Sequence, residues 1–585
     1  MIISISASAY LSCLLLVILT RNVTSTSNNP LRNCRCLPHD HCWPSPDEWD
    51  AFNNDIHGTL LRVWPIGSVC HGVTFDQARC DNVRASTHDT LWRISEPAGA
   101  LQANNWEGDE THGSCTIDSI RETVCKQGRI PLYAVMARSA QDVQAAVRFT
   151  RSKNLHVAIR NTGHDGIGRS SGPNSLQINV SRLKEIQFTD EFLLQGGNEP
   201  QGSAVTVGAG VLGMELLAPA RVQGLNVITG TCSSVGAAGG FLQGGVTSLL
   251  GPAYGMSSDN ALEFNIVTAM GLTLVLYGDL VVANQYINGD LFWALRGGGG
   301  GTFGVVVNTT IRTFPDVPAV LLLLTATIPR NEIAGRITES LPDLKCFDNA
   351  TSAIIVHRMF EDRASLSAEV LFINTSDVHL VESRLTTLFA GLDDDGLPYN
   401  ASLTVYPRLS THLAQPRSLD RGGYGLVEGS VLISEERILR PDGASEIMAA
   451  LSGLEYRIGD SVEIFMCAGG QVKANKGISS ALLPAWREAG LLLTIRRALR
   501  PDSLEKEMSN NQLPALRSLE SPYLGSYLNV ADPGESSPKR AFWGDNYNTL
   551  YRIKQRWDRD GLFIVRLGVG SEDWDEEGIC RLQAM

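Results

Sequence analysis

The sequence lacks the features that would place it on nucleic acid, on an acidic membrane surface or across a bilayer. Its formal net charge of −13 leaves no basic face of the kind that contacts with phosphates require. Beyond residue 19, no apolar run is long enough to span a membrane. Internal repeats and low-complexity linkers are absent as well. With 43% hydrophobic and 19% charged residues, the composition is that of a globular protein with a large core.

The first residues form an apolar leader. Residues 2–19 carry no charge, which predicts a signal peptide over residues 1–27, cleaved between Val23 and Ser27. Because no Lys or Arg precedes the apolar run and no small-x-small site is clear, an uncleaved anchor is the alternative. Six glycosylation sequons agree with secretion or a vesicular lumen. They lie at Asn22, Asn179, Asn308, Asn349, Asn374 and Asn400.

Cysteine usage points to the same oxidising environment. Seven of the twelve cysteines follow closely after the leader, and their density predicts a disulfide-pinned N-terminal segment over residues 28–128. These are Cys34, Cys36, Cys42, Cys70, Cys80, Cys115 and Cys125. The alternative is a metal site, although no second CxxC-type pair completes a zinc spacing, so no metal ligand is predicted. That site would use Cys34, Cys36, His39, His41 and Cys42.

Regular structure is expected to begin near residue 130. Tyr133 to Ala137 alternates as a strand does, and His156 to Arg160 is a second strand. Between them, Ser139 and Asp142 form a capping box for a helix that ends near Lys153. The three elements predict a β-α-β unit that runs directly into a glycine-containing turn.

A length of 585 residues predicts about three or four domains. After the N-terminal segment, changes of pattern divide the chain into residues 129–315, residues 316–538, which are expected to form a separate α+β domain, and residues 539–585. Further strands are expected at Leu176 to Val180, Ala204 to Val207, Phe264 to Ala269, Leu272 to Leu276, Val305 to Ile311, Ala319 to Thr327, Ile354 to Met359, Ala368 to Ile373 and Leu562 to Val565. Helices are expected at Ala481 to Ala489 and Tyr547 to Trp557.

Three glycine-rich segments hold the residues most suited to chemistry. They run from Arg160 to Ser170, from Gly230 to Gly240 and from Leu295 to Gly304. Turns with several free backbone N–H groups can hold a diphosphate, and glycine lets the backbone approach a ligand closely. His164 in the first segment offers a nucleophilic ring nitrogen, although a solvent loop with a lone histidine is the simpler interpretation of that segment alone.

Together these segments resemble the berberine-bridge-enzyme-like branch of the vanillyl-alcohol-oxidase type FAD flavoproteins. The Arg-x-x-Gly-His turn of that family matches Arg160 to His164, and its Cys-x-x-Val-Gly-x-x-Gly-Gly pattern matches Cys232 to Gly240. The tail Phe542 to Tyr547 is similar to the segment that closes over the isoalloxazine. The resemblance implies an α+β fold, in which a PCMH-type FAD-binding domain made of two parts carries an inserted α+β substrate domain.

The resemblance also implies how FAD is held. His164 would be bonded to the C8 methyl group of the flavin and Cys232 to C6. The expected cofactor-binding residues are His164, Cys232, Arg160, Asn161, Thr162, Gly163, Asp165, Gly168, Gly230, Val235, Gly236, Gly239, Gly240, Asn546 and Tyr547. Cys232 has a second interpretation, as a small buried side chain or a disulfide partner. Setting it aside leaves ten cysteines after the leader, which could all pair.

One departure from the family concerns the segment Gly244 to Thr247. Relatives commonly have Gly-Gly-Gly-His there, so a proton-transfer role at Thr247 is in doubt. The catalytic base would come from the inserted domain and is not identified by the sequence. A non-catalytic secreted flavin-binding glycoprotein is therefore the alternative from another functional class.

The implied activity is that of an oxidase of fungal secondary metabolism, which passes a hydride from substrate to flavin N5. No Gly-x-Gly-x-x-Gly with a strand before it and an acidic residue about twenty positions later marks a nicotinamide site, so dioxygen is the expected acceptor, giving hydrogen peroxide. The specific prediction is oxidative cyclisation in ergot alkaloid biosynthesis; an isoamyl-alcohol-oxidase-like enzyme or a sugar oxidase is the alternative. Apolar strands at Ala319 to Thr327 and Ala368 to Ile373 predict a small, mostly apolar substrate.

Overall fold

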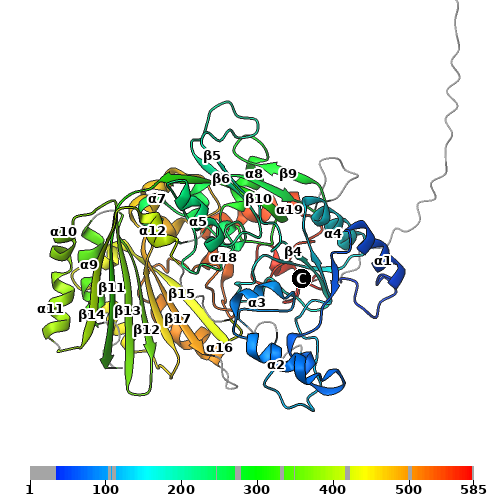
Figure 1. The fold of residues 1–585 in the computed structure, drawn as a ribbon, viewed down its shortest axis with the longest axis horizontal. Coiled ribbons are helices and arrows are strands. Elements are labelled where there is room, and N and C mark those ends of the chain that lie inside the picture. Colours follow the sequence, from blue (N-terminus) through cyan, green and yellow to red (C-terminus); the bar gives the residue numbers. More distant parts are fainter. Residues whose placement is uncertain are drawn as a thin grey trace, which may run out of the picture.

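The computed structural model describes residues 34–102, 107, 113–245, 247–269, 278–329, 335–347, 350–394, 396–415, 422–498 and 504–582. The predicted leader, the sequons at Asn22 and Asn349 and the expected strand Leu272 to Leu276 lie outside these residues. Within them, three sheets and their covering helices form the predicted α+β fold (Figure 1). None of the described helices has the length and apolar character needed to cross a membrane.

The first sheet contains the predicted β-α-β unit. Its strands lie in the order β1-β2-β4-β3, with β2, β4 and β3 parallel and β1 antiparallel at the edge. Helix α4 (Ala140–Ser152) begins at the predicted capping box, in which the Ser139 hydroxyl accepts a hydrogen bond from the Asp142 N–H. The strands are β1 (Leu60–Arg62), β2 (Tyr133–Met136), β3 (His156–Arg160) and β4 (Ser175–Asn179).

The second sheet follows in the chain and is built around one long strand, β10, which pairs with β6, β7 and β8. Helix α5 (Gly213–Val222) connects β6 to β7, and α8 (Gly289–Leu295) precedes β10. The strands are β5 (Ile186–Thr189), β6 (Ala204–Gly208), β7 (Leu225–Val227), β8 (Ala261–Val267), β9 (Leu280–Ala283) and β10 (Val305–Pro315).

The third sheet is wholly antiparallel, in the order β14-β11-β13-β12-β16-β17-β15, and fills the left of Figure 1. The strands are β11 (Ala319–Pro329), β12 (Ser352–Met359), β13 (Arg363–Ile373), β14 (Tyr399–Tyr406), β15 (Leu426–Ser434), β16 (Ser461–Met466) and β17 (Ala489–Ala498). One face packs on helices that include α9 (Gly335–Phe347), α11 (Thr386–Asp394), α14 (Gly443–Ser452) and α17 (Leu513–Arg517). Because successive side chains along a strand point to opposite faces of a sheet, the remaining side chains of these strands point away from the helices.

The C-terminal segment returns to the first two sheets. Helix α19 (Tyr547–Trp557) packs on α8, and its buried Lys554 donates hydrogen bonds to the backbone oxygens of Thr302 and Phe563 at 2.6 and 2.5 Å. Lys554 also pairs with buried Asp558 at 2.6 Å. The hydrogen bond from Lys554 to the Thr302 backbone oxygen connects the tail to the glycine-rich segment before β10.

Two predicted elements are wrong. Residues Ala481 to Ala489 do not form a helix, because Pro484 lacks the N–H that a helix interior needs; a short 3-10 turn (Pro484–Arg487) precedes β17 instead. Leu562 to Val565 is not a strand. Its backbone N–H groups at Leu562 and Phe563 bond the Asp558 carboxylate, so they are unavailable to a sheet.

Four disulfides pin the N-terminal segment, as predicted in outline. They join Cys34 to Cys580, Cys36 to Cys42, Cys70 to Cys80 and Cys115 to Cys125. The alternative metal site is therefore wrong, since its three sulfurs are used in two of these bonds. Complete pairing is also wrong, because Cys467 is a buried free thiol whose pKa is raised by burial. Helices α1 (Pro46–Asp55), α2 (Gln77–Ser86) and α3 (Thr90–Ser95) lie in this segment.

Candidate active site

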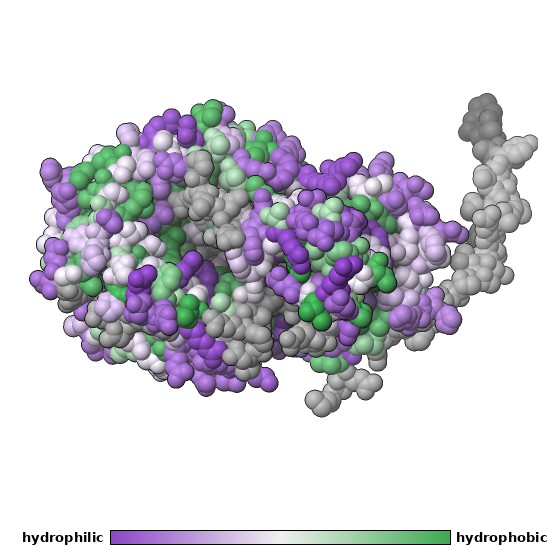
Figure 2. Space-filling model, turned by 60° about the horizontal axis from the view of Figure 1, so that its bottom comes forward, coloured by the Kyte–Doolittle hydropathy of each residue, from purple (hydrophilic) through white to green (hydrophobic). Residues whose placement is uncertain are grey.

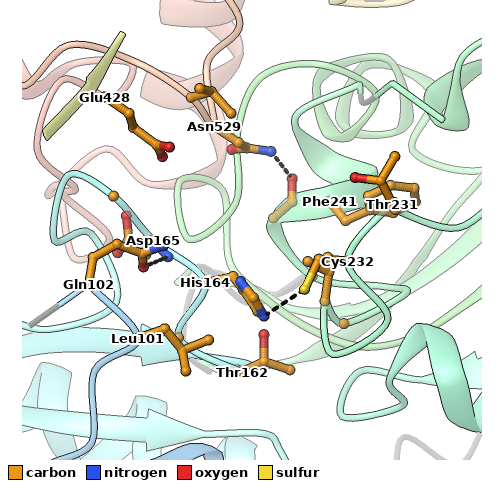
Figure 3. Close-up of a pocket in the computed structure, with 18 of the residues that line it drawn as sticks. Leu101, Gln102, Thr162, His164, Asp165, Thr231, Cys232, Phe241, Glu428 and Asn529 are labelled. Carbon is orange, nitrogen blue, oxygen red and sulfur yellow. Dashed lines mark hydrogen bonds between the residues drawn. The ribbon is translucent and has the colours of Figure 1, made fainter. Parts of the chain in front are cut away.

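A cavity of about 1150 Å³ lies between the two glycine-rich turns and the free face of the third sheet. The turns after β3 and β7 form one side of it, and strands β12, β13, β15, β16 and β17 contribute the other. Figure 3 shows side chains from both sides pointing into this space. On the outer face seen in Figure 2, hydrophilic residues are interspersed with small groups of apolar ones.

His164 and Cys232 meet at the cavity. The His164 Nε2 atom lies 3.9 Å from the Cys232 Sγ (Figure 3). The Ser234 hydroxyl lies 2.7 Å from the His164 Nε2 and 3.3 Å from the Cys232 Sγ. Cys232 forms no disulfide and is half-buried. Two nucleophilic side chains from separate turns thus face the same small volume.

The two turns can approach each other because they contain glycine. A Cβ atom at Gly236 or Gly239 would collide with the Asn161 side chain, and Gly163 has a φ of +83°, which favours glycine. The Asn161 Oδ1 and Gln243 Oε1 atoms are buried without a hydrogen-bond partner among the described residues, and both side chains line the cavity. Orphaned acceptors beside a glycine cradle fit the hydroxyl and amino donors of a dinucleotide such as FAD.

Eleven of the fifteen predicted cofactor residues line the cavity. They are Asn161, Thr162, Gly163, His164, Asp165, Gly230, Cys232, Val235, Gly236, Gly239 and Gly240. The other four have different surroundings. Arg160 is fully buried and donates to the backbone oxygens of Arg93, Glu96 and Pro97 at the end of α3. Gly168 does not reach the cavity wall, although its φ of +78° shapes the turn.

Asn546 and Tyr547 also lie away from the cavity. The Asn546 amide donates to the Leu482 backbone oxygen at 2.8 Å, and the Tyr547 hydroxyl donates to the Glu572 carboxylate. Burial, followed by that carboxylate, raises the pKa of Tyr547. In this structure both residues bond within the protein, and their flavin contacts stay a prediction.

A charged group that the sequence did not predict lies on the sheet side of the cavity. The Arg496 guanidinium on β17 donates to Glu463 on β16 at 2.6 Å and to Glu428 on β15 at 3.2 Å. All three side chains line the cavity. Burial raises the pKa of Glu428, and the attraction of Arg496 opposes that rise. The available signal was the presence of charged residues inside three mostly apolar strands, one each in β15 and β16 and two in β17.

The Glu428 carboxylate lies against the first glycine-rich turn. A Cβ atom at Gly166 would come within 2.6 Å of the Glu428 Oε1 atom, so only glycine leaves room for the carboxylate there. Gly166 follows His164 by two residues and lines the cavity, so the buried Glu428 carboxylate lies beside the turn that carries His164.

The N-terminal segment supplies part of the wall, which the sequence did not predict. Leu101 and Gln102 line the cavity, and the Gln102 side-chain oxygen accepts a hydrogen bond of 3.3 Å from the Asp165 N–H (Figure 3). Tyr424 forms a β-bridge with Gln102 and is stacked on the His88 ring, with centroids 4.5 Å apart. The segment therefore connects the first turn to the loop that leads into β15.

The sheet side of the cavity is mixed in polarity, although two of its strands were used to predict a mostly apolar substrate. The predicted strands exist, but Leu322 and Leu324 of β11 pack in the helix-side core, and Leu321 belongs to the core on the other face. Of the β11 leucines, Leu323 lines the cavity. Charged side chains share the wall with apolar ones. The wall includes Leu323, Ile354, Val356, Phe465 and Leu492 beside Arg358, Glu369, Glu428, Glu463 and Arg496. On β13, the Glu369 carboxylate lies 3.0 Å from the His412 Nε2.

The fold and this cavity are those of a two-part flavoprotein with an inserted substrate domain. The family model described as FAD binding domain matches residues 131–277, and the one described as berberine and berberine like matches residues 526–570. Among solved structures, the VAO-type flavoprotein MtVAO615 of Myceliophthora thermophila C1 is 28% identical, with a TM-score of 0.80 over 94% of this chain and 100% of that one. Berberine bridge enzyme of Eschscholzia californica shares the fold, with a TM-score of 0.58 and 17% identity, over 77% of this chain and 91% of that one.

Curated relatives narrow the family. The flavin-dependent oxygenase ucdF of Aspergillus ustus is 63% identical over 92% of this chain and 99% of its own length. The FAD-linked oxidoreductase easE of Arthroderma otae is 40% identical over 93% of this chain and 90% of its own. The chain therefore belongs to the berberine-like FAD-linked oxidoreductases, and FAD is its cofactor.

Proposed function

We propose that the protein is an oxidase that holds FAD through two covalent bonds, one from His164 and one from Cys232. The separation of 3.9 Å between the His164 Nε2 and the Cys232 Sγ is the observation that supports this proposal best. Each attachment replaces a flavin C–H bond with a bond to nitrogen or sulfur. The two protons and two electrons that each attachment releases are taken up by dioxygen, which becomes hydrogen peroxide.

Glu428 is the proposed catalytic base. Its carboxylate is buried, lies at the Gly166 turn and faces the space in which the flavin ring and the substrate would meet. Bound FAD supplies the two-electron acceptor, and dioxygen then takes the two electrons and two protons. Glu428 accepts a proton from a substrate N–H or O–H group while the hydride leaves the neighbouring carbon. Thr247, where relatives often have histidine, lines the cavity without offering a base.

The proposed substrate is a small organic molecule with an apolar body and at least one polar group. Ile354, Val356 and Phe465 would contact the body, while the charged groups at either end of the wall would bind polar groups. Oxidative cyclisation of an alkaloid precursor stays the specific prediction. A second candidate is oxygen insertion, because the 63% identical relative is named an oxygenase.

Anaerobic mixing tests the oxidase proposal. A tryptophan-derived prenylated amine, a small aliphatic alcohol and an oligosaccharide are each added to the purified protein, and flavin absorbance is followed. The proposal expects bleaching by the amine, and recovery with peroxide in air. Incorporation of ¹⁸O from dioxygen into the product would favour the oxygenase instead. Bleaching by none of many donors would favour the non-catalytic alternative.

We also propose that the protein acts in the secretory pathway or outside the cell. Four disulfides support this, since such bonds persist in oxidising compartments. Glycosylation is expected at Asn374 and Asn400, whose side chains are exposed. Asn179 is fully buried and donates to Gln177, so no glycan is expected there. Mass spectrometry of the secreted protein would test both statements.

A further inference from the structure

Arg496 is shared unequally between two carboxylates. Its Nη1 lies 2.6 Å from the Glu463 Oε2, whereas its Nε lies 3.2 Å from the Glu428 Oε2. Both carboxylates are largely buried, with 17% and 8% of their side chains exposed. The shorter charge-assisted bond is the stronger one, so Glu463 takes most of the neutralising effect of the guanidinium.

Sheet geometry fixes this arrangement. The three residues lie on adjacent strands, in the order β16-β17-β15, and Arg496 is directly paired with Glu428 across β17 and β15. Glu463 is paired with Thr494 instead, so it reaches Arg496 along the diagonal. The guanidinium therefore bonds carboxylates on both neighbouring strands, with the shorter contact to Glu463 on β16 and the longer one to its direct cross-strand partner Glu428 on β15.

We propose that Glu463 is a positioning residue, which holds the Arg496 guanidinium toward β16 and thereby keeps the proton affinity of Glu428 high enough for it to act as a base near neutral pH. The inference rests on the proposed role of Glu428. The charged and titratable groups facing Glu428 are Arg496 on β17, Glu463 on β16, Asp165 in the first glycine-rich turn and Tyr527 from the C-terminal part. Of these, Arg496 alone stabilises the Glu428 anion. The position of Arg496 therefore determines how readily Glu428 binds a proton.

Removing the charge of Glu463 should lower the pKa of Glu428. Glu463→Gln removes a negative charge that repels Glu428 and leaves Arg496 with one carboxylate to bind. Both changes stabilise the Glu428 anion, so its pKa should fall, by about one unit, which is about tenfold in the proton dissociation constant. Glu463→Asp keeps the negative charge on a shorter side chain. In this variant the pKa of Glu428 should lie between its values in wild type and in Glu463→Gln.

The test is a pH titration of the flavin absorption spectrum of the purified holoprotein, between pH 4 and pH 9. Wild type should show a spectral step that Glu428→Gln abolishes. Glu463→Gln should move the midpoint of that step down by about one pH unit. The matched control is Glu369→Gln, a carboxylate on the same sheet face that does not contact Arg496, and its midpoint should equal that of wild type.

The outcomes separate the inference from the function on which it rests. A Glu428-dependent step whose midpoint is unchanged or raised in Glu463→Gln overturns the positioning role alone. A spectrum without any Glu428-dependent step overturns the placement of the base and the inference together. Circular dichroism and retained flavin establish that each variant is folded before it is titrated.

Discussion

The imidazole Nε2 of His164 and the thiol of Cys232 lie 3.9 Å apart, although 68 residues separate them in the chain. Each sits in a glycine-rich turn at the end of a strand, and the Ser234 hydroxyl contacts both. The separation suits two bonds to one edge of a single flat ring system. The proposed double attachment of the flavin depends on that juxtaposition.

Removing one of the two side chains should leave the flavin attached through the other. After acid precipitation, His164→Ala and Cys232→Ala are each expected to retain flavin in the pellet, with an altered absorption spectrum. The double variant should release it completely. Cys467→Ala is the control, because this buried thiol lies outside the cavity wall and should leave attachment and spectrum unchanged. Full release from either single variant would limit the linkage to one bond.

Gly166→Ala should slow flavin reduction by at least about tenfold without releasing the flavin. The added Cβ would lie 2.6 Å from the Glu428 Oε1 and would push the carboxylate from its place. Stopped-flow absorbance under anaerobic conditions gives the rate. Gly477→Ala, at an exposed position with open space around it, is the control. An unchanged rate in Gly166→Ala would show that the position of Glu428 does not matter.

Arg160→Met should destabilise the fold while keeping the flavin bound. The Arg160 guanidinium is surrounded by backbone oxygens at the end of α3, so its loss leaves these acceptors unsatisfied, at a cost of about 2–4 kcal/mol. Urea unfolding measures the change, and acid precipitation measures attachment. Loss of flavin with unchanged stability would restore Arg160 to the cofactor site that the sequence predicted.

His357 should make the protein sensitive to acid. It is buried on β12 with no hydrogen-bond partner among the described residues, and burial lowers its pKa from 6.5 to about 4. Below pH 6.5, His357 therefore binds a proton in the unfolded chain but stays neutral in the folded protein. The free energy of unfolding thus decreases as the pH falls toward 4.

The variant His357→Leu should reduce this loss by on the order of 1–3 kcal/mol, measured as the difference in unfolding free energy between pH 7 and pH 4. Some dependence should persist, because burial also lowers the pKa of His156 to about 4. Exposed His379 provides the control, and His379→Gln should behave as wild type. Equal pH dependence in His357→Leu and wild type would assign the acid sensitivity to other groups.

The parts of the site that the sequence predicts are local. His164 and Cys232 each belong to a short glycine-rich turn, where the residue types carry the signal without knowledge of the fold. Glu428, Glu463 and Arg496 escaped prediction because they come together only through the strand order β16-β17-β15, which differs from their order in the chain. Asn546 and Tyr547 were assigned to the flavin by resemblance, and their hydrogen bonds within the protein could be seen only in the structure.

Mass spectrometry of the digested protein tests the central claim most directly. The digest is made under mild acid, and fragments that absorb at flavin wavelengths are isolated and sequenced. The account predicts one FAD joined to two peptides, the first containing His164 and the second Cys232. A flavin found free, or bound to a single peptide that contains neither residue, would contradict it.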